Sequence, residues 1–199
     1  MSCPGTQPSD PRVRRTRTLL QDALRGLLHE KKFGAISVQD IAERATVNRA
    51  TFYAHYDDKY ALLSSVLRSE LGESLSKRFP RPAPLTQESL THLMAAVFEF
   101  IAEMRSQCPD SARDMENTMG TMLQEEIYSF IDNWIRIGGI APSLRGTPRE
   151  TIATVFSWSM FGGALRWGHG DRKQTSLEAA KEIAMLLMPS DAAVALALR

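Results

Sequence analysis

The sequence lacks the features of a membrane or secreted protein. No apolar run in its 199 residues approaches the roughly 20 residues that a membrane-spanning helix needs. The amino end has no apolar stretch after its charges, so it does not follow the pattern of a secretory signal. Cysteine occurs only as Cys3 and Cys108, which argues against a disulfide scaffold and favours a reducing compartment. We therefore expect a cytoplasmic protein with no membrane partner.

Signatures of the common enzyme classes are also missing. There is no phosphate-binding glycine loop, no nucleophile elbow and no cluster with metal-ligand spacing, and the histidines are scattered. The adjacent acids Glu125 and Glu126 do not form a catalytic pair, because neighbouring positions on a helix diverge by about 100°. Strand patterns are nearly absent as well. We therefore expect no enzyme activity, no cofactor and no metal site.

Charge is distributed unevenly along the chain, although the formal net charge is only +1. The first 60 residues contain ten basic and seven acidic side chains, and the remainder contains 14 basic and 16 acidic ones. Four of the basic residues, Arg12, Arg14, Arg15 and Arg17, follow one another closely. A basic end on a near-neutral body suits a polyanionic partner, and a solvated arm without a partner is the alternative.

The remaining patterns are helical and predict an all-α fold. Apolar residues recur at helical spacing, and Ser37, Thr147 and Thr175 each begin a sequence that resembles a capping box. Prolines at positions 80, 82 and 84 form a connector that no helix or strand can cross. The expected helices cover about residues 12–32, 38–45, a short stretch after 48, 57–75, 87–105, 113–137, 148–167 and a last helix from 176 to before 189.

The segment 37–59, SVQDIAERATVNRATFYAHYDDK, is the most informative part of the sequence. It predicts two short helices joined by three or four residues. Helices this short are marginal alone and need apolar contacts to hold them together. The apolar residues have the spacing of a helix-turn-helix: Val38, Ile41, Ala42, Ala45, Val47 and Phe52. A plain helical corner in a bundle is the alternative, but the second helix also carries polar and aromatic side chains suited to DNA.

The run SVQDIAERATVNRATFYAHYDDKYALL resembles the amino-terminal domain of TetR-like (tetracycline-repressor-like) transcriptional regulators, over roughly residues 15–66. The resemblance implies a disordered leader (1–11), a three-helix DNA-binding domain (12–56), a connecting helix (57–79) and a larger helical domain (80–199) that dimerises and binds a small molecule. It implies a ligand-responsive repressor that binds a palindromic operator as a homodimer. The alternative is a helical adaptor or structural protein without specific DNA binding.

The resemblance also implies roles for individual residues. Arg49, Thr51 and Tyr53 are expected on the groove-facing surface, and Arg49 is our first candidate for base readout because its fork can engage guanine O6 and N7. A phosphate contact is the alternative for Arg49. The other expected DNA-binding residues are Ser37, Asn48, His55, Lys59, Arg15 and Arg17, the last two from an arm before the first helix. Tyr56 is expected to pack inward. The family usually has glycine in the turn where this chain has Thr46, and we expect the turn to adjust to a negative φ there.

Two further sites are expected in the carboxyl-terminal domain. The last two helices are candidates for a dimer interface, with Phe156, Met160, Gly163, Trp167, Leu177, Ala180, Ala184 and Leu187 as its residues. Methionine and aromatic residues on the middle helices are candidates for a pocket that takes a small apolar or amphipathic effector: Met94, Phe98, Met115, Met119, Met122, Phe130, Trp134 and Trp158. Packing within one chain is the alternative for both sets.

Overall fold

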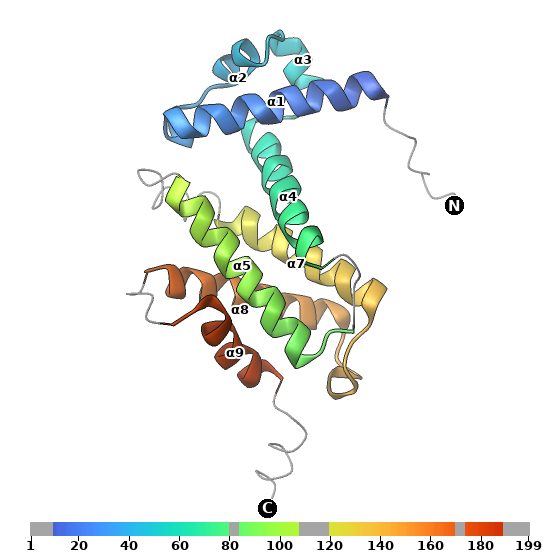
Figure 1. The fold of residues 1–199 in the computed structure, drawn as a ribbon. Coiled ribbons are helices and arrows are strands. Elements are labelled where there is room, and N and C mark those ends of the chain that lie inside the picture. Colours follow the sequence, from blue (N-terminus) through green and yellow to red (C-terminus); the bar gives the residue numbers. More distant parts are fainter. Residues whose placement is uncertain (1–9, 80–83, 108–119, 170–173, 189–199) are drawn as a thin grey trace, which may run out of the picture. The chain divides into compact units, whose positions relative to one another are not determined.

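The computed structural model describes residues 10–79, 84–107, 120–169 and 174–188 (Figure 1). Within these ranges the secondary structure is helical, and the β contact is a single isolated bridge between Leu85 and Ile140. This confirms the predicted all-α fold. In the described part, no helix is both long and apolar enough to cross a membrane. The chain divides into two compact units between Val66 and Leu67, and we call them the N-terminal and C-terminal units.

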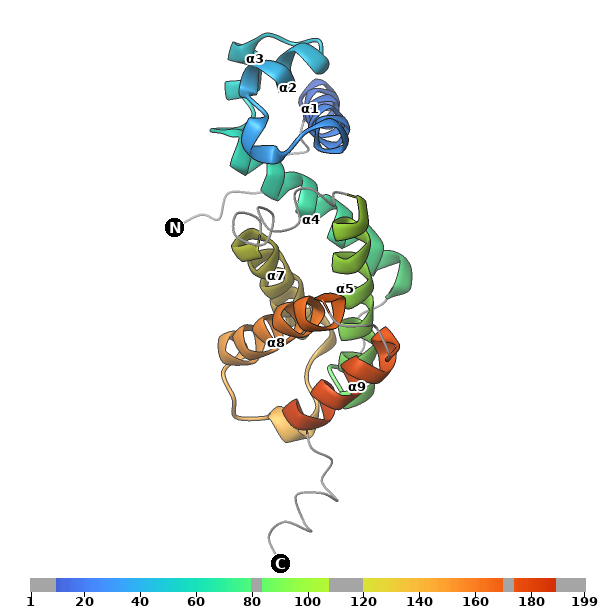
Figure 2. The ribbon, with the colours of Figure 1, turned by 90° about the vertical axis from the view of Figure 1, so that its left-hand side faces the viewer.

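The N-terminal unit contains α1 (Pro11–Glu30), a 3-10 turn η1 (Phe33–Ala35), α2 (Val38–Arg44), α3 (Arg49–Tyr53) and the first residues of α4 (Lys59–Arg78). Helix α2 packs against α1, and α3 packs against α2 (Figure 2). The start of α1 is set by Asp10, whose carboxylate accepts a hydrogen bond from the amide of Arg12 at 2.9 Å, with Pro11 as the first helical residue. An aspartate cap followed by proline is a typical helix start.

The core of the N-terminal unit brings the three helices and the start of α4 together. Its buried side chains include the apolar residues that predicted the helix-turn-helix, namely Ile41, Ala42, Ala45 and Phe52. Tyr56 is also buried, as expected, and its hydroxyl lies 3.2 Å from that of Ser65. Because α2 and α3 are short, this shared core rather than their own backbone hydrogen bonds holds them in place.

The turn between α2 and α3 differs from the prediction. Thr46 has φ +57°, so the chain does not adjust to a negative φ. The amide of Thr46 donates to Glu43 O at 3.0 Å, and that of Val47 donates to Ala42 O at 2.9 Å. These two bonds form a Schellman motif, which requires the left-handed conformation at its central residue. The hydrogen bonds that end α2 therefore outweigh the strain of a β-branched residue at positive φ.

The C-terminal unit contains the rest of α4, followed by α5 (Gln87–Gln107), α7 (Gly120–Gly138), a 3-10 turn η3 (Pro142–Leu144), α8 (Arg149–His169) and α9 (Ser176–Leu187). The capping box predicted at Thr175 is confirmed: its hydroxyl accepts from the amide of Glu178, and the Glu178 carboxylate accepts from the amide of Thr175 at 2.8 Å. Helices α8 and α9 both pack against α5 and against each other.

This packing corrects part of the predicted dimer interface. Four of its residues are buried inside a single chain, so they cannot contact a second subunit: Phe156, Met160, Ala180 and Ala184. Gly163 faces the same interior, because a Cβ atom there would lie 2.7 Å from the Phe98 ring and from Ile183. Trp167 stacks on Phe98 with ring centroids 6.1 Å apart. Leu177 is exposed and Leu187 is half-buried.

The residues predicted to line an effector pocket differ in how deeply they are buried. Three of them, Met94, Phe98 and Trp134, are buried in the core of the C-terminal unit. Met122 and Phe130 are half-buried. Trp158 is 54% exposed on α8. The expected residues Met115 and Met119 lie outside the described residues.

Candidate nucleic-acid interface

Helix α3 has a buried anchor on one side and a short exposed face on the other. Phe52 is fully buried, and its ring contacts that of Tyr53 edge to face at 5.4 Å between centroids. Arg49, Ala50 and Tyr53 are exposed. Residues three and four apart share one face of a helix, so these three side chains form a single surface. The anchor thus sets the rotation of α3 and presents Arg49 and Tyr53 to solvent.

The turn before α3 is held by Asn48. Its side-chain oxygen accepts a hydrogen bond from the amide of Thr51 at 2.7 Å and another from the Thr51 hydroxyl at 2.9 Å. Asn48 is therefore the N-cap of α3, and its amide nitrogen is a donor that suits a DNA phosphate. The Thr51 hydroxyl stabilises the cap in this structure, so a contact from Thr51 to DNA would require that hydroxyl to turn.

The N-terminus of α2 contains a complete capping box. The hydroxyl of Ser37 accepts from the amide of Asp40 at 3.1 Å, while the Asp40 carboxylate accepts from the amide and the hydroxyl of Ser37 at 2.7 and 2.8 Å. Lys31 pairs with the same carboxylate at 2.9 Å. The Ser37 amide and then Lys31 lower the pKa of Asp40 to about 2, so the carboxylate is charged at neutral pH. A phosphate at Ser37 would therefore meet a carboxylate next to it.

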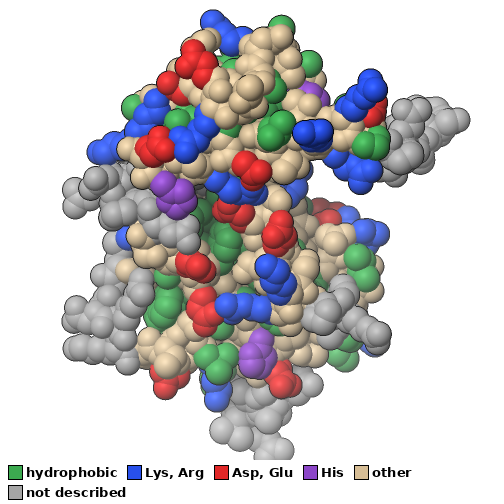
Figure 3. All heavy atoms as spheres, turned by 45° about the horizontal axis from the view of Figure 1, so that its top comes forward, with side chains coloured by type: hydrophobic (Ala, Val, Ile, Leu, Met, Phe, Trp, Pro, Cys, Tyr) green, Lys and Arg blue, Asp and Glu red, His purple; other side chains and the backbone are tan. Residues whose placement is uncertain are grey.

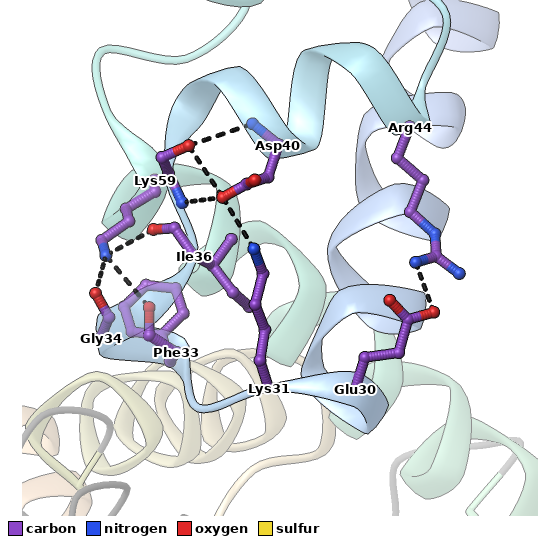
Figure 4. A network of polar contacts seen from close by, with 9 residues as sticks. Glu30, Lys31, Phe33, Gly34, Ile36, Asp40, Arg44 and Lys59 are labelled. Atoms are coloured by element: carbon purple, nitrogen blue, oxygen red, sulfur yellow. Dashed lines mark hydrogen bonds and ion pairs between the residues drawn. The ribbon is translucent and has the colours of Figure 1, made fainter.

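Lys59, the first residue of α4, is engaged within the N-terminal unit (Figure 4). Its ammonium donates hydrogen bonds to the backbone carbonyl oxygens of Phe33, Gly34 and Ile36, at 3.0, 3.3 and 2.8 Å. It also lies 4.7 Å from the centroid of the Phe33 ring and 5.7 Å from that of Tyr60. The predicted phosphate contact from Lys59 would have to displace one of these carbonyls.

The arginines expected in an arm before the first helix lie in α1 itself, which begins at Pro11. The prediction that they lie in an arm before the helix is therefore wrong, because the helix that begins at the Asp10 cap includes Arg12, Arg14, Arg15 and Arg17. Arg15 and Arg17 are exposed, and the Arg17 guanidinium lies 5.6 Å from the centroid of the Tyr56 ring. These side chains project from a rigid helix and not from an extended arm, so they suit phosphate contacts rather than entry into a minor groove.

Sequence reasoning missed one feature of this surface. Ala50 is exposed beside Tyr53, and an exposed methyl group can contact the methyl of thymine. The helical spacing of Ala50 and Tyr53 could have revealed it. The start of α1 at Pro11 agrees with the predicted start at about residue 12. His55, which was predicted, is half-buried.

Basic and acidic side chains are mixed on one face of this unit. On the face drawn in Figure 3, blue basic side chains alternate with red acidic ones. Ion pairs account for part of this pattern, including Arg44–Glu30 at 2.6 Å and Arg25–Asp22 at 2.6 Å. Within the described ranges, no group of three or more histidine, cysteine, aspartate or glutamate residues could hold a metal ion. The basic side chains on this face therefore do not form a uniform basic field.

Comparison with known proteins relates this unit to a family. Residues 20–66 match the family described as "Bacterial regulatory proteins, tetR family". The uncharacterized HTH-type transcriptional regulator YxbF of Bacillus subtilis (strain 168) is 40% identical over 65 residues, which cover 32% of this chain. This chain spans only 17% of the length of that relative.

The fold extends the likeness to most of the chain. A TetR transcriptional regulator from Rhodococcus sp. RHA1 superposes with a TM-score of 0.61 at 15% identity, covering 89% of this chain and 97% of that one. The fatty acid degradation regulator FadR from Bacillus halodurans superposes with a TM-score of 0.53 at 15% identity, covering 93% and 98%. Residues 20–66 are therefore similar to the helix-turn-helix domain of the bacterial TetR family of regulatory proteins, and the chain is similar in fold to solved TetR regulators.

Proposed function

We propose that this protein is a sequence-specific DNA-binding transcriptional regulator that binds a palindromic operator as a homodimer. The observation that carries the proposal is the exposed face of α3, formed by Arg49, Ala50 and Tyr53, on a helix that Phe52 anchors inside a TetR-family domain. Arginine reads guanine through two parallel hydrogen bonds, alanine packs on thymine methyl groups, and the tyrosine hydroxyl donates to phosphate. The same face therefore supplies both readout and positioning.

Two substitutions on this face separate the two roles. Arg49→Ala should relax the preference at one base pair of each half-site and cost about 1–3 kcal/mol on the preferred sequence. Tyr53→Phe removes only the hydroxyl, so it should weaken binding to all sequences alike. Affinities are measured by fluorescence anisotropy on duplexes that differ at single positions. If Arg49→Ala leaves the sequence preference intact, the readout role assigned to Arg49 is wrong.

The proposed dimer uses the outer face of α8 rather than the residues buried in the core. Val155 is 45% exposed, Trp158 is 54% exposed, and Gly162 is exposed, with no neighbouring atom of the described residues within 4 Å of its Cβ position. Their spacing places them on one helix face. A large exposed apolar side chain beside a glycine suits close approach by the same helix of a second copy.

Two changes test this surface by sedimentation of the purified protein. Trp158→Glu should convert a dimer into a monomer, because an unpaired charge would be buried at the interface. Gly162→Ala should favour the helix by about 1 kcal/mol in an isolated chain, so any loss of dimer must come from contact with the partner. A protein that is a monomer before substitution, or a dimer after Trp158→Glu, contradicts this assembly.

A small amphipathic effector completes the proposal. A groove of about 480 Å³ lies between α4 and α5 in the C-terminal unit, with Phe100 and Met104 beside the charged residues Glu73 and Glu103. Apolar and charged groups in one groove suit an amphipathic molecule. A ligand alters DNA affinity only through its different affinity for the two states of the protein. Ligands that raise the melting temperature should therefore be tested for a change in operator affinity.

A further inference from the structure

One side chain joins the two ends of the segment that contains both short helices. The helix-turn-helix begins after Ile36 and ends before Lys59, and the ammonium of Lys59 bonds the carbonyl oxygens of Phe33, Gly34 and Ile36. The acceptors therefore lie immediately before α2, and the donor lies six residues after the end of α3. Figure 4 shows the ammonium of Lys59 at the turn that precedes α2.

The bonding capacity of Lys59 is fully used by these contacts. An ammonium group has three N–H donors, and the three carbonyl oxygens accept one each. The Phe33 ring adds a cation–π contact at 4.7 Å to the ring centroid. Phe33 and Ile36 are both buried, so the turn that supplies the carbonyls is anchored in the core. A phosphate would have to break part of this arrangement before it could bind Lys59.

The turn held by Lys59 leads directly into the cap of α2. Ser37 follows Ile36, and its amide and hydroxyl bond the carboxylate of Asp40. A shift of the Ile36 carbonyl therefore moves the residue that sets the first turn of α2. Helix α2 in turn is joined to α3 by the short turn at Thr46. The position of α3 thus depends on a chain of contacts that starts at the Lys59 ammonium.

We propose that Lys59 is a positioning residue that closes the base of the helix-turn-helix and orients α2 and α3 for DNA, rather than a phosphate contact. This inference rests on the proposed DNA-binding function. It assigns the effect of Lys59 on affinity to the geometry of the folded domain and not to the number of phosphates that the protein neutralises.

The two roles differ in how affinity depends on salt. Each lost phosphate contact reduces the slope of log affinity against log salt concentration by about 0.9, and by about 1.8 for the two subunits of a dimer. Loss of a positioning residue lowers affinity without changing this slope. A residue that only stabilises the fold changes neither quantity, provided that the protein is fully folded during the measurement.

The experiment compares the DNA affinities of wild type, Lys59→Met and Lys181→Met at several salt concentrations, on the duplex that wild type binds best. The temperature is kept well below the thermal unfolding midpoint of each protein, and folding is checked by circular dichroism. Lys181→Met removes the same charge from the exposed surface of α9. We expect Lys59→Met to bind about tenfold more weakly at every salt concentration, parallel to wild type, and Lys181→Met to bind like wild type. Where Lys59→Met does not fold, Lys59→Gln serves in its place, because its amide donates two hydrogen bonds.

Each other outcome has a distinct meaning. A slope reduced by about 0.9 per subunit shows that Lys59 binds phosphate, and this overturns the inference. An unchanged affinity with a lower melting temperature shows a purely structural role, and this also overturns it. Failure of wild type itself to bind any duplex with a salt-dependent affinity refutes the proposed function, independently of Lys59.

Discussion

The strained turn at Thr46 leads to a quantitative prediction. Thr46 is exposed and has φ +57°, a conformation that glycine adopts without strain. Its backbone amide makes one of the two hydrogen bonds that end α2, and its side chain is not part of the core. Replacement of Thr46 by glycine should therefore keep the turn, remove the strain and lose no buried surface.

The expected gain in the free energy of unfolding is the difference between two opposing contributions. A non-glycine residue in the left-handed region costs roughly 1–2 kcal/mol. Glycine makes the unfolded chain more flexible, which offsets about 0.5–1 kcal/mol of that gain. Thr46→Gly should therefore stabilise the protein by about 1 kcal/mol, or about 2–4 °C in the unfolding midpoint of a chain of this length.

Urea and thermal denaturation, followed by circular dichroism, measure this gain. Thr46→Ala is the matched control, because it removes the side-chain branch but keeps the Cβ atom that causes most of the strain. We expect Thr46→Ala to remain well below Thr46→Gly in stability. Equal stabilisation by both variants, or no gain from glycine, would refute the argument that the Cβ at positive φ carries the strain.

Three further predictions concern packing and charge. Gly26→Ala should raise the urea midpoint, because alanine favours the helix by about 1 kcal/mol and the Arg44 guanidinium, 2.8 Å from the new Cβ, can move; a lower midpoint would contradict this. Gly163→Ala should lower the free energy of unfolding by about 1–3 kcal/mol, since its Cβ would lie 2.7 Å from the buried ring of Phe98; an unchanged free energy of unfolding would show that this core can repack. The pKa of Asp40 falls from 3.8 to about 2 in the folded protein. The contribution of its carboxylate to the free energy of unfolding is therefore full above pH 3.8 and is lost as the pH falls through 2. The stability difference between wild type and Asp40→Asn should shrink over that range in acid titrations, and a constant difference would refute the role of the charge.

Local signals in the sequence predicted much of the fold. The capping boxes at Ser37 and Thr175 and the apolar anchor at Phe52 involve residues within a few positions of one another, and the structure contains all three. Such patterns are informative because a helix end and a helix face are both determined by short-range geometry. The family resemblance of the amino end drew on the same segment.

Contacts between distant residues could not be predicted in this way. The carbonyl oxygens that bond Lys59 lie 23 to 26 positions earlier in the chain, and no periodic pattern marks them. The apolar faces of α8 and α9 indicated burial, but periodicity does not say whether the covering helix belongs to the same chain. Met160 and Ala184 are covered by their own chain, whereas Trp158 is exposed.

The most direct test of the central claim is selection of duplexes from random DNA by the purified full chain, followed by titration of the best sequence at several salt concentrations. Operator binding by a dimer predicts a two-fold symmetric consensus, with half-sites about one helical turn or a multiple of it apart, and an affinity that falls steeply as salt increases. Retention of all duplexes alike, with no consensus and no dependence on salt, would contradict it and favour a helical adaptor.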